Sequence, residues 1–183
     1  MRGKLNPKLP TMWQMFFLGA GFLLLETQLV SRLALYFGTT WIVNSVGLTA
    51  LLLVLVLANF YVSAVKPEKL APYYALLVVA LLANYWFPWE RLPYGARTVG
   101  TLLAAGYAVA VFIAGVIFTE TFRRCEHKAE AFGANIVGSV AGGLAQNASF
   151  IVGMKALLLL AVIFYGISAV CATLWKKTFA VSS

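Results

Sequence analysis

Apolar segments of roughly 20 residues recur along the whole chain, and this feature restricts its fold more than any other. A helix of about that length crosses the hydrocarbon core of a bilayer. Of the 183 residues, 62% are hydrophobic and only 11% are charged, whereas a soluble domain has about 25% charged residues. We therefore expect an all-α, polytopic integral membrane protein that has no folded domain outside the membrane and is not an enzyme.

The breaks between the apolar segments combine charged residues with Pro or Gly, as in VKPEKLAP and FPWERLPYGAR. Such combinations end helices. They predict about six transmembrane helices within a single membrane domain, residues 1–183. The expected helices cover residues 12–36, 42–65, 70–87, 97–122, 132–152 and 156–174. The basic N-terminal flank precedes an apolar run that is too long for a signal peptide, so we expect the first helix to be retained.

Lysine and arginine residues are distributed unevenly between the two sides of this topology. One side carries Arg2, Lys4, Lys8, Lys66, Lys69, Arg123, Arg124, Lys128, Lys176 and Lys177. The other side carries Arg91, Arg97 and Lys155. The positive-inside rule therefore predicts that both termini are cytoplasmic. The tryptophans agree, because all of them fall at predicted helix ends, where indole rings prefer the membrane interface: Trp13, Trp41, Trp86, Trp89 and Trp175.

Several classes of ligand are not expected. The formal net charge of +8 does not predict nucleic-acid binding, because the basic residues lie in short loops where membrane topology explains them. His127 is the only histidine, no Asp is present, and Cys125 and Cys171 have no metal-ligand spacing. We therefore expect no cofactor, no metal and no catalytic residue. The segment TETFRRCEHKAEAF mixes charges of both signs, and we interpret it as a solvated connection.

Glu26 and Arg32 are two ionisable residues inside the first apolar segment. An acidic group near the bilayer centre costs about 2.5–3.5 kcal/mol on insertion scales unless it is paired or protonated. Six positions along a helix correspond to a rotation of about 240°, so the two side chains face different directions and do not form an intrahelical ion pair. Arg32 instead shares a polar stripe with Thr27, Gln28 and Ser31.

We therefore expect Glu26 to have a hydrogen-bond partner on another helix. The candidates are Asn44, Asn59, Asn84, Asn135 and Gln146. A functional role is the general expectation for an intramembrane carboxylate. We favour a structural role here, because the pattern shows no second intramembrane acid. On that interpretation Glu26→Gln should leave assembly intact, whereas Glu26→Leu should reduce it.

The fifth predicted helix is rich in small residues. Gly138 and Gly142 form a GxxxG motif, and Asn135 and Gln146 lie on the same helical face. Small residues allow helix backbones to approach closely in lipid, and side-chain amides can hydrogen-bond between helices. We favour a packing role for this face over a substrate-lining role.

Four stretches together resemble a known membrane region: GAGFLLLETQLVSRLALYFGTTWIVNSV, LANFYV, FIAGVIFTETF and GANIVGSVAGGLAQNASFIVGMKALLLLA. The chain is similar, over most of its length, to the C-terminal membrane region of bacterial spermidine-synthase-like proteins, some of which are fused to a major-facilitator-like part. The residues that match the family's first motif are Glu26, Phe37, Gly38, Thr39, Thr40, Trp41, Val43 and Asn44. Those that match the later motif are Gly133, Asn135, Gly138, Gly142 and Gly143.

The resemblance implies a multi-pass protein of the bacterial inner (cytoplasmic) membrane. The chain departs from the family in two respects. Gln146 stands where the family has a glutamate, and the soluble aminopropyltransferase-like domain is missing. The reaction of the larger relatives is therefore not expected of this chain.

Three functions are compatible with these observations. We favour a non-catalytic accessory or scaffold subunit of a larger bacterial membrane complex, in contact with other membrane subunits and with lipid. The first alternative is a small solute transporter or channel that uses Glu26 and Arg32 and works as a homo-oligomer. The sequence shows no clear inverted repeat to support it. The second alternative is a membrane anchor for a separately encoded synthase-like enzyme. An exposed small-residue face on the fifth helix would favour docking, and a face covered within the chain would favour transport.

Overall fold

The computed structural model describes residues 8–38 and 40–180, and these residues form helices and short connections without any β-strand. The long helices are α1 (Lys8–Phe37), α2 (Trp41–Val65), α3 (Ala71–Trp86), α4 (Ala96–Arg124), α5 (Lys128–Ala145) and α7 (Ala156–Ala180). Three short elements are the 3₁₀ turns Trp89–Arg91 and Gln146–Ala148, and α6 (Ser149–Val152). The predicted all-α class is confirmed.

Four helices are long and apolar enough to cross a membrane: Leu9–Phe37, Trp41–Val65, Ala96–Arg124 and Ala156–Thr173. The 16 residues of α3 form a shorter apolar helix. The chain is therefore a helical membrane protein by length and composition. Some predictions concern residues outside the described part of the chain, namely Arg2, Lys4 and Thr39, and the side chains of Lys8, Trp175, Lys176 and Lys177.

The fifth predicted helix differs most from the structure. It was expected to run over residues 132–152, but α5 begins earlier, at Lys128, and ends at Ala145. A 3₁₀ turn at Gln146–Ala148 and the single turn of α6 follow it. Asn and Ser side chains compete with helical backbone hydrogen bonds, which explains a break within QNAS. The chain then turns at Gly153, whose φ of 84° is accessible to glycine at little cost.

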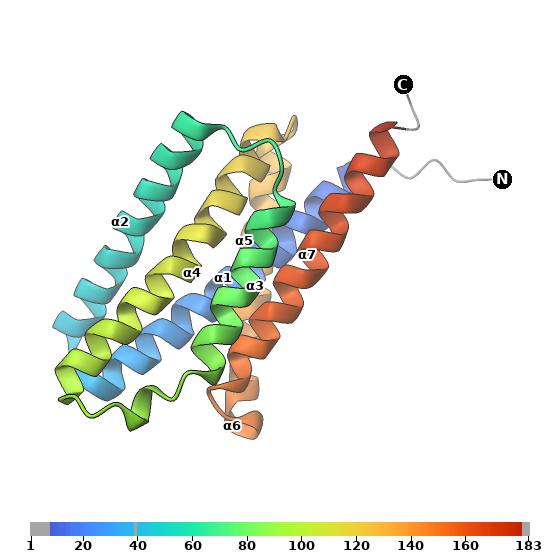
Figure 1. The fold of residues 1–183 in the computed structure, drawn as a ribbon. Helices are drawn as coiled ribbons and strands as arrows, with labels where there is room; N and C mark the ends of the chain where they lie inside the picture. Colours follow the sequence, from blue (N-terminus) through green and yellow to red (C-terminus); the bar gives the residue numbers. More distant parts are fainter. Residues whose placement is uncertain (1–7, 39, 181–183) are drawn as a thin grey trace.

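Four helices form the central bundle, and two pack on its outside (Figure 1). In the bundle, α1 contacts α4 and α7, and α3 also contacts α4 and α7. On the outside, α5 packs along α1, and α2 packs mainly on α4. The N-terminal end of α1 and the C-terminal end of α7 lie at the same end of the molecule (Figure 1).

The same pairs of helices are in contact when each of the first three long helices is exchanged with its counterpart among the last three. In this exchange α1 corresponds to α4, α2 to α5 and α3 to α7. The contact of α1 with α5 then becomes that of α4 with α2, and the contact of α1 with α7 becomes that of α4 with α3. The exchange leaves the α1–α4 pair and the α3–α7 pair as they are. Each half of the chain has three long helices. Because successive helices run in opposite directions, the first helix of the second half runs opposite to the first helix of the first half. The helix packing is that of an inverted-topology repeat.

The directions of the helices agree with this exchange. Gln14 at the start of α1 bonds Thr121 at the end of α4, so α1 and α4 are antiparallel. Asn135 and Ser139 of α5 bond Met15 and Gly19 of α1 in the same order, so this pair is parallel. The pair α2 and α4 is parallel as well, because Leu55 and Asn59 contact Gly115 and Thr119.

A short sequence pattern accompanies the exchange of α1 with α4. The stretch AGFLLLET, residues 20–27, and the stretch AGVIFTET, residues 114–121, share Ala-Gly followed after four residues by Glu-Thr. The sequence shows no clear inverted repeat, whereas the helix packing shows one. The pattern is too short to be recognised without the structure, because six of every ten residues in the chain are hydrophobic.

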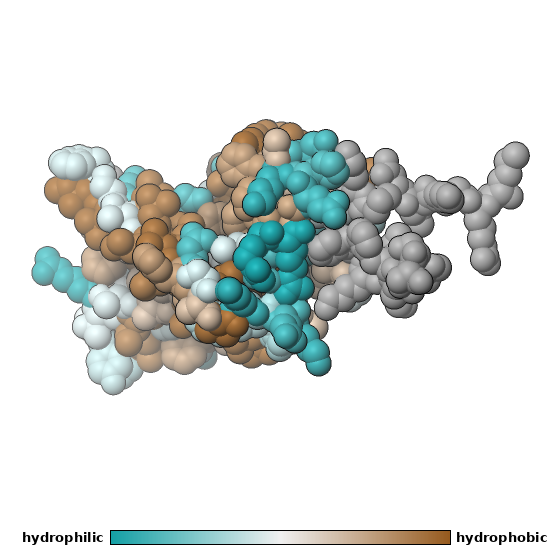
Figure 2. All heavy atoms as spheres, turned by 90° about the horizontal axis from the view of Figure 1, so that it is seen from above, coloured by the Kyte–Doolittle hydropathy of each residue, from teal (hydrophilic) through white to brown (hydrophobic). Residues whose placement is uncertain are grey.

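The end of the bundle that is uppermost in Figure 1 is hydrophilic. Seen from this end, hydrophilic side chains form a patch between apolar flanks (Figure 2). The α2–α3 connection and the α4–α5 connection both lie here, and they carry the exposed residues Lys66, Glu68, Lys69, Arg123, Glu126, His127 and Lys128.

Candidate functional site

Three polar side chains of α1 are buried in the central bundle. Gln14, Gln28 and Arg32 are 1%, 0% and 4% exposed. They lie on one face of α1, because 14 residues correspond to about four helical turns and four residues to about one. Gly21 lies on this face between them. The interior of the bundle therefore contains polar side chains of α1 towards both of its ends.

The polar groups on this face at the N-terminal end of α1 are hydrogen-bonded across four helices. The Gln14 side-chain amide donates to the Tyr74 hydroxyl at 3.2 Å and to the Thr121 hydroxyl at 3.1 Å. The hydroxyls of Tyr74 and Ser168 are hydrogen-bonded at 2.8 Å, and Ser168 donates to the backbone carbonyl of Gln14 at 3.1 Å. This network joins α1, α3, α4 and α7.

The polar groups at the opposite end lack such partners. Both side-chain amide atoms of Gln28, the Nε of Arg32 and the hydroxyl of Tyr107 are buried, and none is hydrogen-bonded to a residue that the structure describes. Tyr107 of α4 lies opposite Gln28, because α1 and α4 are antiparallel and Gln14 and Thr121, 14 residues away on each helix, are hydrogen-bonded. Three neighbouring residues therefore present unpaired polar atoms to one another in the core.

Tyr165 of α7 lies between the centre of the bundle and a cavity on the side of the bundle where α2 and α5 pack. Its ring lies against Gly21, where a Cβ atom would approach Tyr165 Cε2 to 3.0 Å. The Tyr165 side chain is completely buried, and its hydroxyl has no partner among the described residues. The cavity that it helps to line has a volume of about 190 Å³.

The walls of this cavity are mostly apolar, with a few neutral polar groups. Leu18 and Phe22 of α1 and Leu55 of α2 are among the apolar residues. The Thr119 hydroxyl donates to Asn59 Oδ1 at 2.7 Å on one side of the cavity. Asn135 of α5 lies on another side and donates from its amide to the backbone carbonyl of Met15 at 3.0 Å. The cavity thus lies between α1, α2, α4 and α5, away from the polar core.

Glu26 is half-buried and has no hydrogen bond or ion pair with any residue that the structure describes. It lies one helical turn from Phe22, which lines the cavity. The expected partner on another helix is not found. Asn59, Asn84 and Asn135 bond other groups, and Asn44 is exposed. Gln146 instead lines a separate hollow of about 190 Å³ with Thr27 and Ser31.

Gly138 and Gly142 pack directly on the backbone of α1. A Cβ atom at Gly138 would collide with the carbonyl of Phe16, and one at Gly142 would collide with the carbonyl of Ala20. The small-residue face of α5 is therefore covered within the chain. The opposite face of α5 is exposed and apolar, as the exposed fractions of Val137, Val140 and Leu144 show: 59%, 60% and 68%.

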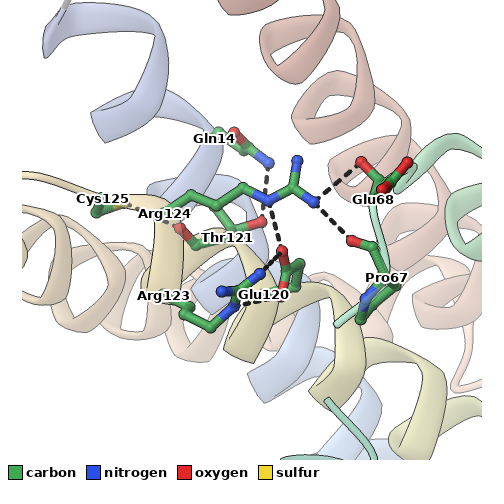
Figure 3. A network of polar contacts seen from close by, with 8 residues as sticks. All are labelled: Gln14, Pro67, Glu68, Glu120, Thr121, Arg123, Arg124 and Cys125. Atoms are coloured by element: carbon green, nitrogen blue, oxygen red, sulfur yellow. Dashed lines mark hydrogen bonds and ion pairs between the residues drawn. The ribbon is translucent and has the colours of Figure 1, made fainter. Parts of the chain in front are cut away.

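The sequence interpretation missed an ion-pair network at the C-terminal end of α4 (Figure 3). The Glu120 side chain is completely buried and accepts hydrogen bonds from Arg123 at 2.7 and 2.8 Å and from Arg124 at 2.5 Å. Arg124 also donates to the backbone carbonyls of Pro67 at 2.6 Å and Glu68 at 2.9 Å. The network fastens the α2–α3 connection to α4.

The prediction of a solvated connection over TETFRRCEHKAEAF is therefore wrong for its first half. Glu120 and Thr121 are buried within α4, and the Cys125 that follows the helix is 6% exposed. The relevant signal was the spacing of Glu120, Arg123 and Arg124, because residues three and four positions apart are neighbours on a helix. Among the described residues, no three His, Cys, Asp or Glu side chains form a group that could hold a metal ion.

Comparisons with known proteins add no assignment. The chain matches no protein-family model, and neither curated proteins nor solved structures include a significant match. The resemblance to the membrane region of spermidine-synthase-like proteins therefore stays a prediction.

Proposed function

We propose that this chain is a multi-pass solute-transport protein of the bacterial cytoplasmic membrane, and that its solute path follows the face formed by α1, α2, α4 and α5. The main support is the inverted-topology repeat, because many transporters are built from such repeats and bind substrate near the interface between them. The cavity beside Phe22 lies where α1 and α4 of the two halves meet. It combines apolar walls with a few polar groups, as small-molecule sites do.

The same proposal includes six membrane spans with cytoplasmic termini. The 16 residues of α3 extend about 24 Å, which is somewhat less than the thickness of a bilayer core, and α3 packs between α4 and α7. The end that carries Lys66, Lys69, Arg123, Arg124 and Lys128 is more basic than the end that carries Arg91, Arg97 and Lys155. This difference supports a cytoplasmic location of the first end.

A path on one face of a six-helix unit needs a second unit to enclose it. The cavity lies between the two outer helices, α2 and α5, which make little contact with each other. Half-buried Glu26 lies on the same side of α1. A second copy of the chain or another membrane subunit would cover this face, and we propose a second copy because an isologous pair needs no further gene product.

An accessory or scaffold subunit is the second candidate function. The observation that favours it is the wide apolar surface of α2 and α5, on which Leu52, Leu53 and Leu57 are each about 60% exposed. Large apolar surfaces mark protein or membrane contacts. The GxxxG face does not contribute, because α1 covers it. An anchor for a separately encoded enzyme would use the same surfaces.

Cysteine accessibility in native membranes separates these functions. The background is a chain with Cys125→Ser and Cys171→Ser, since these are the two natural cysteines. Single cysteines at Phe22 and Asn59 test the cavity, and single cysteines at Leu53 and Leu57 are matched controls that face away on α2. A transport path predicts that a membrane-impermeant maleimide labels the cavity positions and leaves the controls unlabelled. Labelling of neither set would contradict the transport proposal and favour a subunit surrounded by lipid or protein.

A further inference from the structure

The cluster of Gln28, Arg32 and Tyr107 differs from every other buried polar group of the bundle in carrying a charge without a counter-charge. Arg32 is 4% exposed, and no described residue forms an ion pair or hydrogen bond with it. A buried charge is costly unless it is paired and hydrogen-bonded. Something other than the described side chains has to compensate this guanidinium.

Among the side chains that the structure describes, no acid reaches Arg32 from the helices around it. No Asp is present, and α2, α3 and α7 contain no Glu. The side chain of Glu90, in the connection before α4, lies outside the described part of the chain. Glu120 lies at the far end of α4, where Arg123 and Arg124 already bind it. Glu26 is about 9 Å away along the axis of α1 and points in a different direction.

The network around Gln14 serves as an internal comparison. Gln14 and Gln28 are the same residue on the same face of α1, at its two ends, and both are completely or almost completely buried. The Gln14 amide nitrogen has two hydroxyl partners from α3 and α4, and only the amide oxygen lacks a partner among the described residues. Both amide atoms of Gln28 are unpaired, although Tyr107 lies opposite on α4. The Gln28 end thus has hydrogen-bonding capacity that the described chain does not use.

We propose that Gln28, Arg32 and Tyr107 bind a small monovalent anion, such as chloride or a carboxylate group, in the outer half of the helix bundle. Arg32 supplies the compensating positive charge and N–H donors, the Gln28 amide donates a hydrogen bond, and the Tyr107 hydroxyl donates another. Buried water could hydrogen-bond the same groups but would leave the charge uncompensated. The site does not depend on the proposed transport function, because a structural anion would satisfy it equally.

The first experiment measures thermal unfolding of the purified full-length chain in sodium gluconate, sodium chloride and sodium formate at constant ionic strength. Gluconate is too large for a site inside the bundle. We expect the wild-type midpoint to rise saturably with chloride or formate, since a ligand that binds only the folded state stabilises it. A response to formate alone would identify a carboxylate site, and a response to both would identify a general small-anion site. Equal midpoints in all three salts would overturn the proposal.

Two variants and a control locate the effect. Arg32→Gln should abolish the anion response and should be at least as stable as wild type in gluconate, because it removes the uncompensated charge. Tyr107→Phe should weaken anion binding about tenfold through the loss of one hydrogen bond. Arg97→Gln, at the exposed start of α4, should keep the wild-type response. An equal anion response in Arg32→Gln would overturn the assignment.

Broadening of the chloride NMR line by the wild-type protein gives a readout that does not depend on unfolding. Excess formate should reverse the broadening if both anions share the site. Broadening that Arg32→Gln retains would show that chloride binds elsewhere, with only water at Arg32.

Discussion

Gly138 of α5 lies directly against the backbone carbonyl of Phe16 in α1, so the two helices meet backbone to backbone. Gly142 repeats the contact one turn later, at Ala20. Side-chain hydrogen bonds from Asn135 to Met15 and from Ser139 to Gly19 lie beside these contacts. Close packing and interhelical hydrogen bonds are the main attractions between helices in lipid. They hold α5 on the outside of a bundle to which it otherwise contributes little.

Gly138→Ala should therefore destabilise the protein, because the added methyl group has to displace a helix backbone rather than a flexible side chain. Overpacking of this kind costs about 1–3 kcal/mol. Gly133→Ala is the matched control on the same helix, since no atom lies within 4 Å of the added Cβ. The comparison needs only the unfolding temperatures and the yields of folded protein in detergent. Equal values for the two variants would show that α5 separates from α1 at little cost.

Glu120→Gln should loosen the C-terminal end of α4. The substitution keeps the size of the side chain but removes the charge that Arg123 and Arg124 share. We expect a loss of about 1–2 kcal/mol, less than for a fully buried ion pair, because Arg123 is half-exposed. Limited proteolysis of the α2–α3 connection should also become faster, since Arg124 holds Pro67 and Glu68. Glu126→Gln, at an exposed position, should change neither quantity.

Gln14→Leu and Gln28→Leu should have opposite effects on stability in a buffer without small anions. Gln14→Leu removes the donor to Tyr74 and Thr121. Tyr74 keeps its hydrogen bond with Ser168, whereas the buried Thr121 hydroxyl loses this partner, and such a loss costs about 1–3 kcal/mol. Gln28→Leu removes two buried polar atoms that have no partner, so it should be neutral or stabilising. Thermal unfolding of the two variants in gluconate measures the difference. A large loss in Gln28→Leu would mean that ordered water satisfies the amide.

The helices were predictable from the sequence because hydrophobic length and the Pro, Gly and charged breaks are local signals. The expected range 42–65 differs from α2 by one residue, and 70–87 differs from α3 by one residue at each end. The contact of Gly138 with another helix also follows from a local pattern. The break after Ala145 was not predicted, since the apolar pattern continues through it and the tendency of Asn147 and Ser149 to interrupt a helix is weak.

The arrangement of the helices and most of the site were not predictable in the same way. Which helix faces α1 depends on contacts between residues about 120 positions apart, and a chain of mainly apolar residues gives few distinctive pairs. The burial of Arg32 depends on α4, because an arginine near a helix end can also extend its charged group to the interface. Glu120 was overlooked because its charged neighbours suggested a loop, although their spacing fits a helix.

Cys125 should react slowly with thiol reagents at neutral pH. Burial raises the pKa of its thiol above the ordinary value, and nearby Lys128 offsets only part of this effect. The thiolate is the reactive form, so the alkylation rate should increase as the pH rises and should still be increasing above pH 9.0, the ordinary value. A Cys171→Ser chain isolates the reaction, and the same chain in denaturant gives the reference rate. Equal rates at neutral pH in the folded and denatured chains would contradict the buried position.

Glu26→Leu should leave folding unchanged or improve it, which is the opposite of the expectation from sequence. That expectation assumed a hydrogen-bond partner on another helix, and the described chain provides none. Removal of a half-buried carboxylate without a partner lowers the cost of placing α1 in the bilayer. Glu26→Gln should behave similarly, because an amide in the same position also lacks a partner. Thermal unfolding and folded yield in detergent test both variants. If Leu reduces stability and Gln does not, Glu26 has a polar partner in the assembled protein, and the face between α2 and α5 is where that partner binds.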